Sequence, residues 1–100
     1  MNKVAIAFFT KDKTELSKRT IEPLLDGQHA LFWFDGSDTP AGQALSLNYP
    51  HLTGHYANVR GGPDAAVAYA LTQILRHGAD YTHIGIVEND VLLHADWFGP

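Results

Sequence analysis

The hydrophobic residues of this chain gather in short continuous runs that are separated by polar stretches. The first run, residues 4–9, is apolar throughout instead of alternating with polar residues. That pattern is typical of a central parallel strand that is covered on both faces. Three more strands are predicted: one at residues 29–34, where the apolar run is again continuous, a short one at residues 56–59, and one at residues 81–88.

A helix is expected between the first two strands, at residues 13–25. Asp12 and Glu15 have the D-x-x-E spacing of a capping box, in which the first side chain caps the helix and the second reaches back. Gly27 is placed to end the helix. Pro23 lies in its last turn and is expected to kink or weaken it.

The clearest helical pattern covers residues 64–77. Its apolar positions recur at i, i+4, i+7 and i+8, with Pro63 at the first turn and Gly78 after the last one. A shorter helix is predicted at residues 41–47, inside an irregular connection that covers residues 39–54. The apolar positions of the long helix are Val67, Leu71, Ile74 and Leu75.

The predicted elements follow one another as strand, helix, strand, long connection, strand, helix and strand. Strands that alternate with helices form parallel sheets with right-handed crossovers. We therefore expect an α/β fold, Rossmann-like, with three layers (α/β/α) and a mainly parallel sheet. The sequence has no internal repeat or linker, so residues 1–100 are expected to form a single domain.

Composition excludes several classes of protein. The net charge is −4, from seven Lys/Arg and eleven Asp/Glu, which argues against a general nucleic-acid binder. Because there are no cysteines, a disulfide framework, a thiolate zinc site and a cysteine nucleophile are excluded. The apolar N-terminal run is too short for a membrane span and no cleavage site follows it. We expect a cytoplasmic protein without a transmembrane segment, either free or peripheral at the membrane.

The strand predicted at residues 81–88 leads into the sequence Glu-Asn-Asp. In an extended strand Glu88 and Asp90 share one side, and Asn89 points to the other. The two acidic residues are roughly 7 Å apart along the strand, which suits one carboxylate on a metal and the other on a sugar hydroxyl. Carboxylate oxygens favour Mg²⁺ or Mn²⁺. The alternative is that these three residues are only a polar exit from the strand.

Two other strand ends carry candidate residues. The sequence Asp-Gly-Ser at residues 35–37 follows the second strand, where Asp35 can accept a hydrogen bond from a base or ribose, or only from local backbone N–H groups. The sequence Arg-Gly-Gly at residues 60–62 precedes the long helix, whose N-terminus attracts anions. The alternative there is a loop that requires positive φ angles. Neither the G-x-G-x-x-G fingerprint nor a P-loop is present.

Taken in order, these motifs resemble the N-terminal half of GT-A-type glycosyltransferases, in particular the large family 2. The resemblance spans nearly the whole chain and implies binding of a UDP- or GDP-linked sugar with Mg²⁺ or Mn²⁺. It implies that Asp35 contacts the base and that Asp90, assisted by Glu88 or Asn89, meets the metal. Trp97 is similar to an aromatic residue that follows the family's D-x-D motif. The residues that we expect to bind the nucleotide are Thr10, Lys11, Asp35, Ser37, Arg60, Glu88 and Asn89.

The chain departs from the family's pattern at several positions. Phe34 stands at the first acid of the family's D-D-G-S, Glu88 replaces the usual aspartate, and Val67 stands near an expected asparagine. His94 follows the acidic motif and is expected at the surface. Because no downstream catalytic carboxylate is included, we expect a donor-binding half that is inactive alone, either truncated or an unusually short relative of the family.

Other interpretations of the sequence remain open. A non-catalytic Rossmann-like module would bind a nucleotide or a protein and use Glu-Asn-Asp only as a strand exit. A nucleotidyltransferase is disfavoured, because residues 11–13 contain no glycine. A truncated sheet exposes an edge or an apolar face that can pair with a second copy, so a homo-oligomer is a further alternative. Four basic residues form either a solvated helix face or a site near a phosphate, for which Lys11 is best placed: Lys11, Lys13, Lys18 and Arg19.

Overall fold

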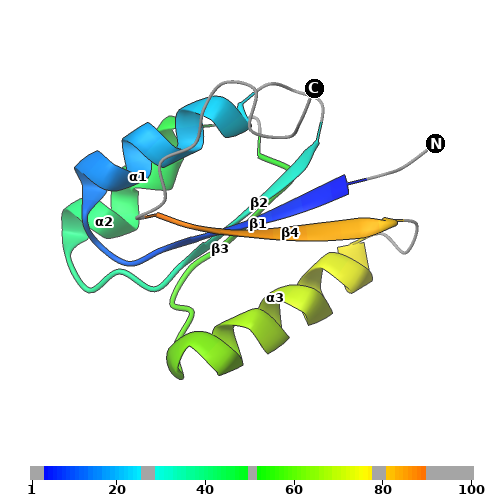
Figure 1. Cartoon of the computed structure of the whole chain (residues 1–100). Helices are drawn as coiled ribbons and strands as arrows, with labels where there is room; N and C mark the ends of the chain where they lie inside the picture. Colours follow the sequence, from blue (N-terminus) through cyan, green and yellow to red (C-terminus); the bar gives the residue numbers. More distant parts are fainter. Residues whose placement is uncertain (1–3, 26–28, 50–51, 78–80, 90–100) are drawn as a thin grey trace.

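A computed structural model describes residues 4–25, 29–49, 52–77 and 81–89 of the chain (Figure 1). In this part of the chain, four strands form one sheet in the order β3-β2-β1-β4, and every pair of neighbours is parallel. The predicted α/β fold with a parallel sheet is confirmed. The strands are β1 (Val4–Thr10), β2 (Ala30–Asp35), β3 (Gly54–Tyr56) and β4 (His83–Glu88).

Helices cover both faces of the sheet, which makes the fold a Rossmann-like sandwich of three layers (Figure 1). The first face carries α1 and α2, and the second carries α3. Because α1 connects β1 to β2 and α3 connects β3 to β4, the chain changes faces between its first and last crossovers. The helical elements are α1 (Thr14–Ile21), the 3₁₀ turn η1 (Glu22–Leu24), α2 (Pro40–Ala44), the 3₁₀ turn η2 (Leu45–Asn48) and α3 (Gly62–His77).

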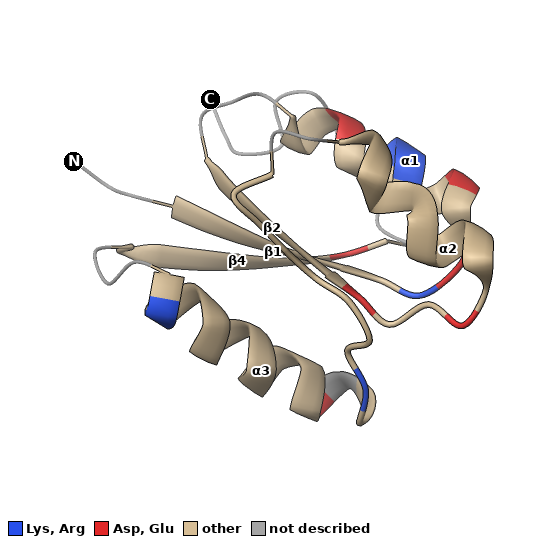
Figure 2. Ribbon diagram, turned by 180° about the vertical axis from the view of Figure 1, so that it is seen from behind, with Lys and Arg blue, Asp and Glu red and all other residues tan. Residues whose placement is uncertain are grey.

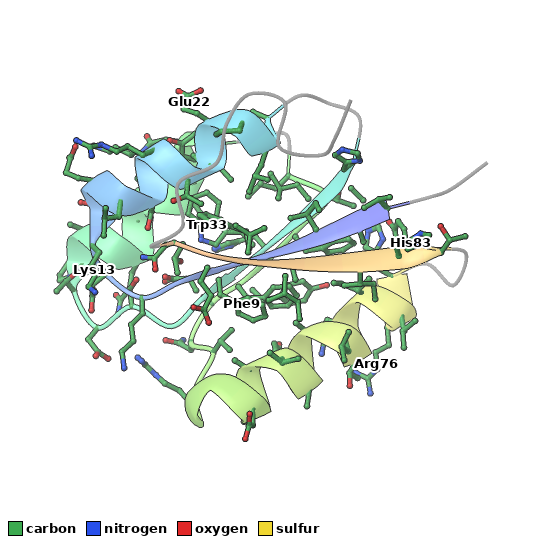
Figure 3. The ribbon with its side chains drawn as sticks, in the orientation of Figure 1. Phe9, Lys13, Glu22, Trp33, Arg76 and His83 are labelled. Carbon is green, nitrogen blue, oxygen red and sulfur yellow. The ribbon has the colours of Figure 1, made fainter. Side chains whose placement is uncertain are left out.

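The central strand β1 is buried on both sides, as its continuous apolar run predicts. Phe8 packs toward α1, with its ring edge-on to Trp33 at a centroid distance of 4.9 Å. The next residue, Phe9, packs toward α3 and stacks on Phe34. Figure 3 shows Trp33 and Phe9 on opposite faces of the sheet. Two apolar cores therefore lie on either side of one sheet, and successive residues of β1 contribute to different cores.

The structure corrects the predicted start of the first helix. Asp12 does not cap it; Lys13 occupies the N-cap position without a side-chain cap bond. Both residues have left-handed backbone angles, with φ of 55° and 48°, and the Asp12 carboxylate instead binds the start of α2. At the other end α1 tightens into η1 at Pro23, as a proline in the last turn requires.

Several predicted boundaries are displaced, by up to three residues in the third strand. The third strand was expected at residues 56–59, whereas β3 covers Gly54–Tyr56. It begins earlier because Thr53 already bonds the backbone of β2 through its N–H and hydroxyl, and it ends earlier because Asn58 turns the chain with a φ of 58°. The short helix expected at residues 41–47 divides into α2 and η2. Gly27, Gly78, Asp90, His94 and Trp97 lie outside the described residues.

The apolar run of the last strand suggests burial on both faces, but the strand is partly exposed. Within the described residues β4 pairs only with β1, and Ile86 is 49% exposed. Two residues of the predicted apolar stripe of α3, Leu71 and Leu75, are also exposed. Of the stripe, the helix buries Ile74 against the centre of the sheet, together with Ala70, and Val67 is half-buried at the cleft. In the described part of the chain, no helix has the length and apolar character needed to cross a membrane.

Candidate functional site

A cleft of about 390 Å³ opens at the carboxyl ends of β1 and β4, on the side of α3. Its apolar floor includes Phe9, Phe34 and Ile86. Charged side chains border it, and Figure 2 shows how acidic and basic residues gather at this end of the sheet while the strands themselves carry few charges. The charged residues that line the cleft are Lys11, Arg60 and Glu88.

The sheet divides the predicted site residues between its two faces. Register pairs Phe9 with Glu88 and with Phe34, and these three residues line the cleft. The side chains of the adjacent positions Thr10, Asp35 and Asn89 lie on the opposite face, although Thr10 and Asn89 also border the cleft. There the Thr10 hydroxyl donates to Asp35, and the Asn89 amide donates to Ser17. The predicted separation of Glu88 from Asn89 is confirmed, and Asp35 lies on the side of Asn89.

Asp35 lies at the centre of a buried hydrogen-bond network on the α1 face. Its Oδ1 accepts hydrogen bonds from the Thr10 hydroxyl at 2.7 Å, from the Ser37 hydroxyl at 2.5 Å and from the Ser37 N–H at 3.3 Å. The Thr10 hydroxyl in turn accepts a bond from Trp33 Nε1 at 2.8 Å. Asp35 is only 2% exposed and is not among the residues that line the cleft. In this structure it orders the ends of β1 and β2.

Asn89 joins the end of β4 to the first helix. Its side-chain amide donates to the Asp12 carbonyl at 3.2 Å and to the Ser17 hydroxyl at 3.0 Å. Its own carbonyl accepts a bond from the Thr20 hydroxyl at 3.0 Å. The residue borders the cleft, but these contacts direct its side chain into the α1 face. Asn89 therefore fixes the point from which the chain leaves β4.

Asp12 connects the loop after β1 to the start of α2. Its Oδ1 accepts from the Thr39 hydroxyl at 2.6 Å and from the Thr39 N–H at 2.9 Å, and Asp38 N–H also donates to the carboxylate. The Thr39 hydroxyl, followed by the Thr39 N–H, holds the pKa of the Asp12 carboxyl below its ordinary value of 3.8. These bonds hold the loop in its left-handed conformation beside the cleft, where Lys11 lies.

Replacing Asp12 by asparagine is expected to flatten the dependence of stability on acid pH. Because folding lowers the pKa of this carboxyl, its contribution is complete above pH 3.8 and is lost as the pH falls below that value through the folded pKa. Urea midpoints measured from neutral pH downward should therefore fall less steeply for Asp12→Asn than for the native chain. Thr39→Val, which removes the hydroxyl donor, should reduce the slope in part. An unchanged slope in Asp12→Asn would contradict this assignment.

Arg60 links the loop before α3 to the turn after β2. Its Nη1 donates to the Gly36 carbonyl at 2.7 Å and to Asp38 Oδ1 at 2.9 Å, while its side chain remains half exposed at the border of the cleft. Gly61 and Gly62 follow with φ angles of +100° and +85°, so the prediction that this loop requires positive φ is confirmed. A Cβ at Gly62 would meet no atom within 4 Å, which leaves the backbone there open to the cleft.

Three aromatic rings form a column on the cleft face of the sheet. Tyr56 of β3 stacks on Phe34 at 4.9 Å with an interplanar angle of 7°, and Phe34 stacks on Phe9 at 5.4 Å and 25°. Phe9 and Tyr56 are not among the predicted site residues, although Phe9 ends one predicted strand and Tyr56 begins another. Their common face could only be recognised once the register of the three strands was known.

One carboxylate at the cleft has the chemistry of the predicted metal ligands. Glu88 is exposed at its border, and its carboxylate is the hard oxygen donor that Mg²⁺ and Mn²⁺ prefer. Asp90, the other predicted ligand, lies outside the described residues. Within the described ranges, no group of three or more His, Asp or Glu side chains is arranged to hold a metal ion. Because Mg²⁺ is commonly bound through one or two carboxylates together with phosphate oxygens, Glu88 fits such a partial site.

In comparisons with known proteins, no family model matches this chain, and neither a curated protein nor a solved structure matches it.

Proposed function

We propose that the cleft binds a nucleoside diphosphate sugar and that this chain is the donor-binding portion of a metal-dependent glycosyltransferase. One observation carries the proposal: the cleft lies at the carboxyl ends of β1 and β4, between the strands where the connecting helices change faces. In open parallel sheets, ligands bind at this switch point. The resemblance of the strand-end motifs to family-2 glycosyltransferases selects the class of ligand.

The charges around the cleft suit a diphosphate. Lys11 and Arg60 bring two cationic side chains to its border, and the N-terminus of α3 follows Gly61 and Gly62 there. Backbone N–H groups at a helix start attract anions, and the absence of a side chain on both glycines permits close approach. The two cationic groups would also stabilise the negative charge that develops on a departing diphosphate.

Glu88, together with Asp90, would hold the divalent cation. When bound, Mg²⁺ or Mn²⁺ would offset the charge of the diphosphate as the sugar is transferred. Asn89 would hold the Glu88 end of β4 in position, since its buried amide anchors this strand end to α1 and to the loop before it. The described residues at the cleft offer binding and charge compensation, and we expect the 100-residue chain to bind a donor without transferring the sugar.

A second candidate function is a non-catalytic module of the same fold. Two observations favour it: the Asn89 amide and the Asp35 carboxylate are both used inside the protein, which is what a purely structural strand exit and turn would show. Such a module would bind a nucleotide without a metal, or would not bind one.

Calorimetric titration with UDP and GDP separates the two functions. In the presence of Mg²⁺ or Mn²⁺ we expect binding that weakens at least about tenfold on chelation of the metal and in the variants Glu88→Gln and Asp90→Asn, since each change removes a charged metal ligand. Glu22→Gln is the matched control, because Glu22 is exposed on η1, across the sheet from the cleft (Figure 3). Binding that is equal with and without metal, or no binding by a folded chain, would support the non-catalytic module.

A further inference from the structure

We infer that the cleft holds the nucleobase by stacking on the open face of Phe9 and does not read the identity of the base through Asp35. The inference rests on the proposed function, because it takes the ligand to be a nucleoside diphosphate. It differs from the expectation that the family resemblance places on Asp35, namely contact between that carboxylate and the base.

The first observation is the direction of the aromatic column. Tyr56, Phe34 and Phe9 lie on neighbouring strands in the order β3, β2 and β1, and successive rings stack at 4.9 and 5.4 Å. Phe34 is therefore covered on both of its faces, and it is only 1% exposed. Phe9 has a ring partner on one face only among the described residues, and it is partly exposed. The column ends at Phe9.

The cleft begins where the column ends. The next strand after β1 is β4, where Glu88 is the register partner of Phe9 and Ile86 lies on the same face. Both residues line the cleft together with Phe9 and with Val67 of α3. A planar ring placed between Phe9 and β4 would continue the column as its fourth member. Stacking of this kind accepts every base, because each base has an aromatic face.

The second observation is that the polar groups at the end of β2 already have partners inside the protein. The Asp35 carbonyl accepts from Val59 N–H at 2.9 Å, and its side chain bonds Thr10 and Ser37 on the opposite face of the sheet. Gly36 N–H donates to the Thr10 carbonyl at 2.9 Å, and the Gly36 carbonyl accepts from Arg60. The Asp35 carboxylate therefore lies on the face opposite the cleft, and a base in the cleft would compete with existing donors for the backbone carbonyls at this strand end.

The third observation is that Phe34 places an apolar ring in the cleft floor at the end of β2. It stands in the chain where the family's first acid is expected, and its side chain forms part of the cleft floor. An apolar ring replaces a hydrogen-bond acceptor on this side of the sheet. Discrimination between bases requires paired donors and acceptors, whereas an apolar surface distinguishes ligands by size and shape. The charged border of Lys11, Arg60 and Glu88 is then left to select the diphosphate and the sugar.

The test is calorimetric titration of the chain with UDP, CDP, ADP and GDP and with inorganic pyrophosphate, all in Mg²⁺. We expect the four nucleotides to bind within about tenfold of one another and each to bind at least about tenfold more tightly than pyrophosphate, because stacking is shared by all bases. A preference for one base of more than about tenfold would overturn the inference and leave the proposed function in place. If none of the four nucleotides binds, the proposed function itself fails.

Matched variants at the two ends of the column locate the site. Phe9→Leu should weaken binding of all four nucleotides by about tenfold and leave pyrophosphate unchanged, whereas Phe9→Tyr, which keeps the ring, should bind like the native chain. Tyr56→Leu removes a ring from the end that does not line the cleft and should leave affinities unchanged. Asp35→Asn, which keeps the acceptor for Thr10 and Ser37, should not change the ratio of UDP to GDP affinity. Equal losses in Phe9→Leu and Tyr56→Leu, a loss in Phe9→Tyr, or a changed ratio in Asp35→Asn would contradict stacking on Phe9.

Discussion

Replacing Phe8 by alanine is expected to lower the free energy of unfolding by about 3–5 kcal/mol, the range measured for deleting a fully buried ring. Phe8 is 0% exposed, and it packs in one core with Trp33, Ile21 and Leu24. Because small domains have a total stability of about 5–15 kcal/mol, the variant should lose about a fifth of it or more. Urea denaturation followed by circular dichroism would measure the loss.

The control for this variant is Leu47→Ala. Leu47 is also a large apolar residue, but it is 77% exposed on η2, so its truncation should change the free energy of unfolding by no more than about 0.5 kcal/mol. If Phe8→Ala were as stable as Leu47→Ala, the packing of β1 against α1 would not be as described.

Replacing Asp35 by alanine is expected to lower the free energy of unfolding by about 3 kcal/mol, because buried donors lose their common acceptor. The Thr10 hydroxyl, the Ser37 hydroxyl and the Ser37 N–H all donate to Asp35 Oδ1. Water can replace that acceptor only in part at a position that is 2% exposed. The same urea titration measures the loss.

Asp38→Ala and Asp35→Asn serve as controls within the same turn. Asp38 is exposed and pairs with Arg60 at the surface, so its removal should change the free energy of unfolding by less than about 1 kcal/mol. Asp35→Asn retains an acceptor oxygen and should recover most of the stability that Asp35→Ala loses. Equal losses at residues 35 and 38 would show that the buried network does not stabilise the strand ends.

The order and type of the main elements were predictable because β1 and β2 are continuous apolar runs and the long helix repeats at helical spacing. The parallel sheet followed from that order alone. The start of the first helix was not predictable from D-x-x-E, since the partner of Asp12 is Thr39, which lies 27 positions away in the chain and is brought near by folding. A local capping pattern competes with such distant donors, and the sequence does not show which one will win.

The candidate site was predictable strand by strand but not as an arrangement. Alternation placed Glu88 and Asn89 on opposite faces before the fold was known. It could not place Asp35 relative to either, because that depends on the register of β2 and β4 against β1. The aromatic column was not predictable for the same reason: Phe9, Phe34 and Tyr56 are far apart in the chain and share a face only in the assembled sheet.

The two phenylalanines of β1 make strand register decisive for which side chain lines the cleft. Phe8 fills a core and Phe9 forms the cleft floor, so a slip of β1 by one residue would exchange their roles and turn the hydroxyl of Thr10 away from Asp35. Hydrogen bonding to β2 on one side and β4 on the other opposes that slip. The backbone hydrogen bonds of β1 thus maintain both the fold and the set of side chains that line the cleft. An insertion or deletion within β1 would disrupt both together.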